Sequence, residues 1–293
     1  MRAEGFQCLA DSAEISVMGI TEVLLRLPHI YGIARRLLAD VKRDPPACAI
    51  LIDLPDFNLR LAKKLKKLNI PIVYYISPQV WAWRKRRVKL IKRVVDQMLV
   101  ILPFEEEFYR RAGVEATFVG HPLVEELPAA PESTAPARRK LGLASTKGQL
   151  VALLPGSRSA EIKRHLPVLM QAAQQLSLRL PGVEFVLPVA SRHLRPVIER
   201  QVAGSPVPLT IVDGEATTVL NASDVAAVCS GTATLQTALL GKPMVVFYKL
   251  SWLSYFILRR LVNIAHIALV NLIAGKQVVT ELVQRDFTAE QLV

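Results

Sequence analysis

The sequence predicts an α/β protein with two domains, each built around a parallel β-sheet. Three observations carry this prediction: a length of 293 residues, apolar runs that alternate with helical segments, and a central stretch rich in Pro, Ala and Ser. An average domain holds roughly 150 residues, so the length suits two of them. A content of 51% hydrophobic and 21% charged residues is typical of a folded protein with a real core.

The first half alternates strands and helices from residue 48 onward. Apolar runs and helical segments follow one another in the order 48–53, 58–69, 71–77, 83–95, 97–103, 104–113 and 116–120. This order, with nearly continuous apolar strands, is typical of a parallel sheet covered on both faces. We therefore predict an N-terminal Rossmann-like domain over residues 1–126.

A linker and the start of the second domain are predicted at 127–147, because LPAAPESTAPARRK at 127–140 shows no periodicity. A second alternating series fills 148–293. Its first strand leads into a helix that ends at Pro181-Gly182 and whose apolar residues keep a spacing of three and four: Ile162, Leu166, Leu169, Ala173, Leu176 and Leu180. Strands at 184–190, 209–214, 224–230 and 243–249 and a helix at 232–240 complete the series. Two such halves predict a ligand cleft between them, at the carboxyl ends of the strands.

Charge and composition restrict the partners. The net charge is +12, which favours nucleic acid, anionic lipid headgroups or phosphorylated small molecules. The three cysteines have no CxxC or Cys/His ligand spacing, so we expect neither a disulfide framework nor a zinc site, and a reducing cytoplasm fits best. No uncharged apolar stretch reaches the roughly 18 residues of a membrane span, and no apolar signal segment begins the chain. We expect a protein that neither spans a membrane nor is secreted.

Two strand-to-helix turns are candidate anion sites. They are LLPGSR at 153–158 and CSGTATLQ at 229–236. Glycine lets a backbone approach a phosphate, hydroxyl groups donate, and a helix N-terminus favours an anion. The candidate residues are Gly156, Ser157, Arg158, Ser230, Gly231 and Thr232. Ordinary loops and helix caps use the same residue types, so the anion site remains one of two interpretations.

A carboxylate that could act as a general base ends the first strand. Asp53 follows the run CAILI and would lie at the carboxyl end of the sheet, facing the cleft. The alternative is that Asp53 or Asp56 caps the next helix. No histidine pair has metal-ligand spacing and no Asp-x-Asp pair occurs, so we predict no metal and no cofactor. Arg158 and helix termini would have to neutralise a bound diphosphate.

Two segments are candidates for membrane contact. WAWRKRRVKLIKRVV at 81–95 combines Trp81, Trp83 and Arg84 with further cations, which favours anionic headgroups; a solvated basic face and an RNA-binding helix are the alternatives. Residues 251–276 are strongly apolar but interrupted by Arg, Asn and His, which favours a buried helix pair, or a helix and loop, over a membrane-surface element. His121, in VGHP, could face the cleft or serve in capping or packing.

A set of motifs resembles the lipid A disaccharide synthase family, in order and over nearly the whole chain. They are VMGITEVL (17–24), IDLPDFN (52–58), YYISPQVWAWR (74–84), LPFEEEFY (102–109), VGHP (119–122), LLPGSRSAEI (153–162), SGTATLQ (230–236) and LVNLIAG (269–275). The resemblance implies an inverting glycosyltransferase of the GT-B fold in Gram-negative bacteria, bound peripherally to the cytoplasmic side of the inner membrane. Its substrates would be UDP-2,3-diacylglucosamine and 2,3-diacylglucosamine 1-phosphate (lipid X), with no nucleic-acid partner and no cofactor.

The resemblance also implies roles for single residues. Asp53 matches an essential aspartate that is a candidate base, and Arg158 and Asn271 match residues needed for activity. The sequence departs from the family at Gln236, where a glutamate is usual. An amide offers one acceptor where a carboxylate offers two, so ribose binding should weaken. We also expect a strand with a glycine-rich loop before Met1 and further helices after Val293. The competing hypotheses are another transferase or an epimerase acting on UDP-N-acetylglucosamine, and a basic module that binds membrane or RNA without catalysis.

Overall fold

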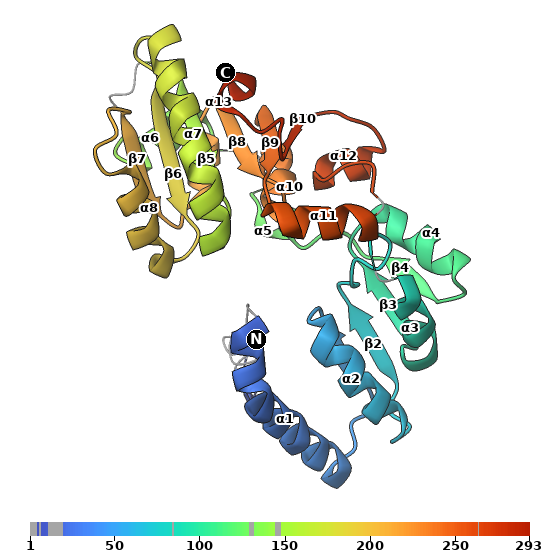
Figure 1. Ribbon diagram of the computed structural model, residues 1–293. Coiled ribbons are helices and arrows are strands. Elements are labelled where there is room, and N and C mark those ends of the chain that lie inside the picture. Colours follow the sequence, from blue (N-terminus) through green and yellow to red (C-terminus); the bar gives the residue numbers. More distant parts are fainter. Residues whose placement is uncertain are drawn as a thin grey trace. The chain divides into compact units, whose positions relative to one another are not determined.

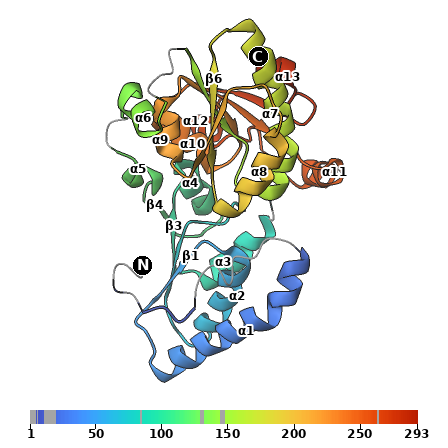
Figure 2. The same cartoon turned by 90° about the vertical axis from the view of Figure 1, so that its left-hand side faces the viewer.

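The computed structural model describes residues 5, 7–10, 20–83, 85–128, 132–143, 148–262 and 264–293. The chain forms two compact units, Met1–His121 and Pro122–Val293. Each unit contains its own parallel sheet, and the predicted α/β fold class is confirmed (Figures 1 and 2).

The first unit is a four-stranded sheet in the order β1-β2-β3-β4. Its elements along the chain are α1 (Ile20–Arg43), β1 (Ala49–Ile52), α2 (Pro55–Lys66), β2 (Ile72–Tyr75), η3 (Lys85–Arg87), α3 (Val88–Val94), β3 (Gln97–Val100), α4 (Pro103–Arg111) and β4 (Ala116–Phe118). The strands pair in sequence order, so right-handed crossovers place α2, α3 and α4 on the same face.

The strand side chains show the same asymmetry. Tyr74 and Met98 are fully buried and pack in one cluster with side chains from α2, α3 and α4. On the other face of β1, Ile50 and Ile52 are exposed. The expectation of helices on both faces was therefore wrong for β1, because successive neighbouring strands return their helices to one side.

The second unit is a six-stranded sheet in the order β10-β9-β8-β5-β6-β7. Its strands are β5 (Leu150–Leu154), β6 (Glu184–Val189), β7 (Leu209–Asp213), β8 (Val225–Cys229), β9 (Met244–Tyr248) and β10 (Thr280–Val283). Its helices are α5 (Leu123–Glu126), α6 (Thr134–Lys140), α7 (Ser159–Arg179), η4 (Arg192–Leu194), α8 (Arg195–Val202), α9 (Ala216–Ala222), α10 (Thr232–Leu239), α11 (Trp252–Leu261), α12 (Leu269–Ala274) and α13 (Ala289–Leu292).

Two apolar layers cover this sheet. One layer joins α7 and α8 to the sheet through Ile162, Leu166 and Ile198, all buried. The other joins α6 and α9 to the opposite face through Ala137 and Leu220 (Figure 2). The strand order reverses between β5 and β8, which is the point where sheets of this type bind their ligands.

A short helix lies in the segment that was predicted to be a linker. Ala137 of α6 is fully buried, and Arg138 donates to the carbonyl of Ala222 and to the Asp224 carboxylate, both at 3.0 Å or less. Residues 134–143 are therefore part of the second unit. The local sequence did not predict this helix, because the contacts that hold it come from α9 and from the start of β8.

Candidate functional site

The first predicted turn connects β5 to α7. Gly156 has a φ of +119°, and a Cβ atom built there would lie 2.5 Å from Oε2 of Glu161. Only glycine fits, because it accepts this backbone conformation and leaves room for the carboxylate. Glycine at this position therefore allows the buried side chain of Glu161 to pack beneath the turn.

Glu161 already occupies donors that were predicted to bind an anion. Its Oε2 accepts from the backbone N–H groups of Ser157 at 3.1 Å and Arg158 at 3.2 Å, and its Oε1 accepts from Nη1 of Arg158 at 2.7 Å. The Arg158 side chain nevertheless remains 53% exposed. A diphosphate would therefore meet the guanidinium group first, while the carboxylate of Glu161 holds the turn.

His165 anchors the same turn from below. Its Nδ1 donates to the carbonyl of Pro155 at 2.8 Å, and its Nε2 accepts from the N–H of Lys249 at 3.1 Å. The ring is fully buried, and burial lowers the pKa of His165. The neutral ring satisfies both partners, so it joins the end of β5 to the end of β9.

The second predicted turn follows β8, the neighbour of β5 in the sheet. The hydroxyl of Ser230 donates to the carbonyl of Ile267 at 2.7 Å, so this side chain holds the segment before α12. Gly231 and Thr232 are exposed, and Gly231 has a φ of +152° with open space where a Cβ would stand. The turn therefore offers an exposed backbone at the amino end of α10.

The two turns lie close together at one edge of the sheet. Tyr248, at the end of β9, has its hydroxyl 3.4 Å from Oε1 of Glu161. Burial raises the pKa of the Cys229 thiol, and the charges of Glu161 and Arg158 also act on it. The strand order thus brings together two segments that are more than seventy residues apart in the chain.

Asn271 is turned inward. It is fully buried; its Nδ2 donates to the Glu281 carboxylate at 2.7 Å and the Val279 carbonyl at 2.9 Å, and its Oδ1 accepts from the N–H groups of Val278 and Val279. Four hydrogen bonds use the full capacity of the amide. Binding of the nucleotide sugar by Asn271 stays a prediction, and its contacts favour a positioning role through Glu281, which also accepts from the N–H of Ala268.

Gln236, the departure from the family pattern, lies on α10. Its Nε2 donates to the hydroxyl of Thr217 on α9 at 2.9 Å. A glutamate in this place would accept from that hydroxyl instead. The amide of Gln236 is therefore the donor in the hydrogen bond that joins α10 to α9.

Asp53 ends β1 in a strained conformation. Asp53 and Leu54 both have left-handed backbones, with φ of 47° and 42°, which is costly for a leucine. The hydroxyl of Tyr74 donates to the Asp53 carbonyl at 2.6 Å, and Nδ2 of Asn58 donates to the same carbonyl at 2.8 Å. These two buried donors fix the backbone and leave the Asp53 side chain exposed.

Helix capping does not explain Asp53. The residue at the N-cap position of α2 is Leu54, whose side chain makes no capping hydrogen bond. Asp56 pairs with Arg87 across the α2–η3 surface. The interpretation that Asp53 caps α2 is therefore wrong, because Leu54 occupies the N-cap position.

The buried carboxylate of Glu105 accepts hydrogen bonds from two side chains of the motif ISPQVWAWR. Oε1 of this buried carboxylate accepts from the hydroxyl of Ser77 at 2.6 Å and from Nε1 of Trp81 at 3.0 Å. Trp81 also packs edge-on against Phe104, with centroids 5.0 Å apart. Burial raises the pKa of Glu105. Trp81 therefore has a packing role in this motif, and its contact with the acceptor or the membrane stays a prediction.

The other residues predicted to contact the acceptor or the membrane differ in their exposure. Trp83 is 37% exposed, and His121 is half-buried. Arg84 lies outside the described residues. Their roles in acceptor or membrane contact stay predictions.

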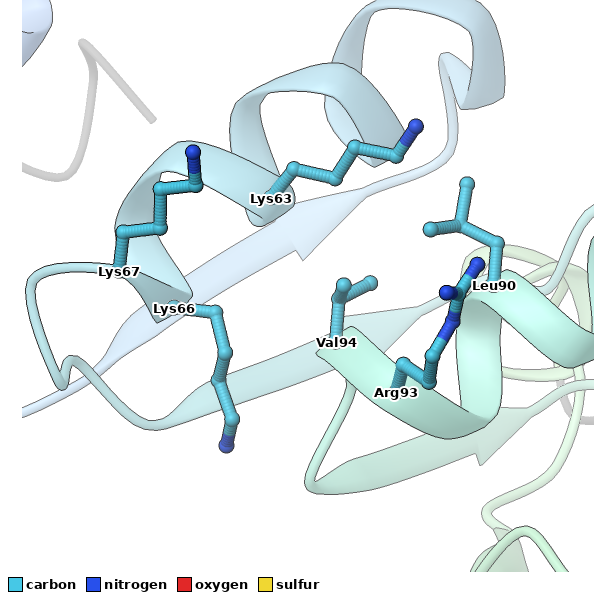
Figure 3. Close-up of a pocket in the computed structure, with 6 residues that line it drawn as sticks. All are labelled: Lys63, Lys66, Lys67, Leu90, Arg93 and Val94. Carbon is cyan, nitrogen blue, oxygen red and sulfur yellow. The ribbon is translucent and has the colours of Figure 1, made fainter.

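A basic groove lies between α2 and α3. Figure 3 shows its lining, which consists of Lys63, Lys66, Lys67, Leu90, Arg93 and Val94. These residues belong to or follow the last turns of helices that return to the amino ends of the strands, so the groove lies at the sheet edge opposite Asp53. Lys66 pairs with Asp96, and cations at a helix C-terminus complement the helix dipole.

Neither a metal centre nor a membrane span is found in the part of the chain that the structure describes. No group of three or more His, Cys, Asp or Glu side chains there could hold a metal ion. None of the helices described is long and apolar enough to cross a membrane.

Comparison with known proteins identifies the family. The family model described as lipid-A-disaccharide synthetase matches residues 1–293. The chain belongs to this family. The disaccharide synthases are glycosyltransferases, and the function expected from the sequence motifs is confirmed at this level.

Two curated lipid-A-disaccharide synthases illustrate the relationship. The chain is 48% identical over 292 residues to that of Myxococcus xanthus (strain DK1622) and 51% identical over 294 residues to that of Anaeromyxobacter dehalogenans (strain 2CP-C). In both cases the whole chain is matched, together with 76% of the relative.

Solved structures agree on the fold of this chain. The UDP-GlcNAc 2-epimerase from Neisseria meningitidis, bound to UDP-GlcNAc, has a TM-score of 0.57 at 12% identity and covers 88% of this chain and 74% of its own. An α,α-trehalose 6-phosphate synthase from Burkholderia multivorans has a TM-score of 0.52 at 13% identity. The match covers 92% of this chain and 67% of the trehalose 6-phosphate synthase. These likenesses show the GT-B fold.

Three buried titratable groups that hold loops were not predicted from the sequence. They are Glu161 and His165 in the second unit and Glu105 in the first. A glutamate three residues after Arg158, at the start of a helix, was a visible capping signal for the first. The same signal marks Glu105, which follows Leu102 by three residues at the start of α4 and accepts from the N–H of Leu102 at 3.1 Å. No comparable signal marks His165, because its partners Pro155 and Lys249 lie further away in the sequence.

Proposed function

We propose that this chain joins UDP-2,3-diacylglucosamine to 2,3-diacylglucosamine 1-phosphate, forming the β-1,6-linked disaccharide 1-phosphate and UDP. The 6-hydroxyl of the acceptor attacks the anomeric carbon, the bond from that carbon to the UDP oxygen breaks, and the hydroxyl proton passes to Asp53. Attack from the side opposite the leaving group inverts the anomeric centre. Family membership supports the reaction class.

One observation carries the UDP half of this proposal. The turns after β5 and β8 lie on adjacent strands where the strand order reverses, and they present Arg158 and the exposed backbone of Gly231 and Thr232. A guanidinium fork can hold two diphosphate oxygens, and its charge stabilises the leaving UDP as the bond breaks.

Asp53 carries the acceptor half. Its backbone is fixed by Tyr74 and Asn58, while its side chain is exposed, as a base that takes a proton from a substrate hydroxyl must be. A positioned general base typically contributes a factor of about 10² to 10⁴ in rate. Strain at a fixed strand end is common where a side chain must be aimed.

Both proposed substrates carry acyl chains, so we also propose that the protein works peripherally on the cytoplasmic face of the inner membrane. The net charge of +12 supports attraction to anionic lipid headgroups.

The test is to incubate the protein with both acylated sugars and follow the disaccharide and UDP. Stoichiometric formation of both products is expected. Turnover of UDP-N-acetylglucosamine without a lipid acceptor would instead favour the epimerase or another transferase, and no product from either mixture would contradict the proposal.

A further inference from the structure

Helix α11 (Trp252–Leu261) presents an aromatic and cationic face to solvent. Trp252 is 73% exposed and stacks on Phe256, with ring centroids 5.7 Å apart. The guanidinium carbon of Arg260 lies 3.9 Å from the centroid of the Phe256 ring. These three residues recur every four positions and therefore share one side of the helix.

This exposure is unusual for a helix of such composition. Phe256 is 42% and Leu261 60% exposed, and none of the side chains described on α11 is buried. The helix is properly capped, since the hydroxyl of Ser251 accepts from the N–H of Ser254. Segment 251–276 is expected from its sequence to form a buried helix pair or a helix and loop. Helix α11 instead stays at the surface, and exposed apolar clusters of this kind mark interaction sites.

The chain segment that contains α11 carries charge of one sign. From Lys249 to Thr280 the sequence has no Asp or Glu, while it has the cations Lys249, Arg259, Arg260 and Lys276. The next carboxylate, that of Glu281, is turned inward to the N–H groups of Ile267 and Ala268. A partner for this surface must be anionic and must accept exposed aromatic rings. A second copy of this chain, with its own charge of +12, is disfavoured.

The location connects α11 to the proposed site. The helix begins four residues after Tyr248, the last residue of β9, and so starts at the carboxyl edge that carries the turns after β5 and β8. The hydroxyl of Tyr248 contacts Glu161 beneath the first turn. Whatever binds α11 therefore approaches the same sheet edge as the nucleotide.

We propose that α11 is a membrane-contacting element that binds the surface of a bilayer containing anionic lipids. Trp252 and Phe256 would enter the boundary between headgroups and acyl chains, where aromatic rings partition well, and Arg259 and Arg260 would pair with lipid phosphates. The inference rests on the proposed membrane association and assigns it to one helix. The groove between α2 and α3 is cationic too, but its lining contains no aromatic ring.

Vesicle flotation tests this assignment. The protein is mixed with vesicles of phosphatidylcholine alone or of phosphatidylcholine with phosphatidylglycerol, and the bound fraction is measured. The variants are the double change Trp252→Ser with Phe256→Ser and the double change Arg259→Gln with Arg260→Gln. The matched controls are Leu178→Ser and Arg179→Gln on α7, where Leu178 is 81% exposed.

We expect the wild type to float with the anionic vesicles, and each α11 variant to bind them at least about tenfold more weakly. The α7 controls should bind like the wild type, and protection by UDP against thermal unfolding should persist in every variant. Equal flotation of the wild type and both α11 variants would overturn the assignment alone. Failure of the wild type to float would overturn the membrane association with it.

Discussion

Nδ1 of His165 donates to the carbonyl oxygen of Pro155 at 2.8 Å, so a fully buried imidazole fixes the strand end that leads into the GSR turn. The same ring accepts a hydrogen bond from the N–H of Lys249. Burial lowers the pKa of His165, which favours the neutral ring that accepts this bond in the folded structure.

We expect stability to fall in mild acid because of His165. Burial lowers the pKa of its folded form, whereas the unfolded residue titrates near 6.5. As the pH falls below about 6.5, the unfolded chain takes up a proton that the folded chain does not, so the free energy of unfolding decreases by up to about 1 kcal/mol by pH 5.5. Urea titrations at several pH values measure this. His165→Leu should remove that part of the pH dependence, and His193→Gln, an exposed control, should keep it; an unchanged slope in His165→Leu would refute the assignment.

Asp53→Asn should lower turnover by about 10² to 10⁴ while leaving UDP protection against thermal unfolding nearly intact. The amide keeps the shape of the side chain but cannot take the proton. Asp56→Asn is the matched control, because it changes a neighbouring carboxylate that pairs with Arg87. Full activity of Asp53→Asn would remove Asp53 from the mechanism.

Tyr74→Phe should loosen the backbone of Asp53, since it deletes the 2.6 Å hydrogen bond to the Asp53 carbonyl. We expect a loss of about 1 kcal/mol in unfolding free energy and a fall in kcat of about tenfold, with KM for the UDP sugar little changed. Tyr75→Phe, the next residue on the opposite face of β2, serves as control. A change in stability without any change in kcat would show that Tyr74 only supports the fold.

Glu161→Ala should weaken UDP binding by about tenfold and lower stability by about 1 to 2 kcal/mol, because the N–H groups of Ser157 and Arg158 lose their acceptor. Isothermal titration with UDP and urea unfolding measure the two effects. Glu199→Ala, which breaks an exposed pair with Arg195, should change neither by more than a small amount. Tighter UDP binding in Glu161→Ala would mean that the carboxylate competes with the diphosphate for these donors.

Gln236→Glu should strengthen UDP binding by about tenfold, or about 1.4 kcal/mol. A carboxylate can accept from both ribose hydroxyls, and the Thr217 hydroxyl, now 2.9 Å from the Gln236 amide nitrogen, can turn to donate to it. Gln201→Glu on α8 is a control for the added charge. Equal affinities for UDP in wild type and Gln236→Glu would place residue 236 away from the ribose.

Local patterns determined much of the fold. The spacing of Ile162, Leu166 and Leu169 predicted a helix with one apolar face, and these side chains are fully buried in α7. The strands of the second unit also lie where apolar runs predicted them, except that β10 (Thr280–Val283) was not predicted. Four residues with two polar side chains carry little strand signal, and pairing with β9 decides their conformation.

The sequence by itself determined the fold class, the positions of the two turns and the aspartate at the end of β1, because each depends on residues that are neighbours in the chain. Only the tertiary structure decided what these groups touch: Glu161 holds the donors of the first turn, Asn271 points inward, Trp81 binds a buried glutamate, and α11 stays exposed. The physical reason is that hydrogen-bond capacity and burial are settled by partners from other strands and helices. Periodicity and motif spacing contain no information about those partners.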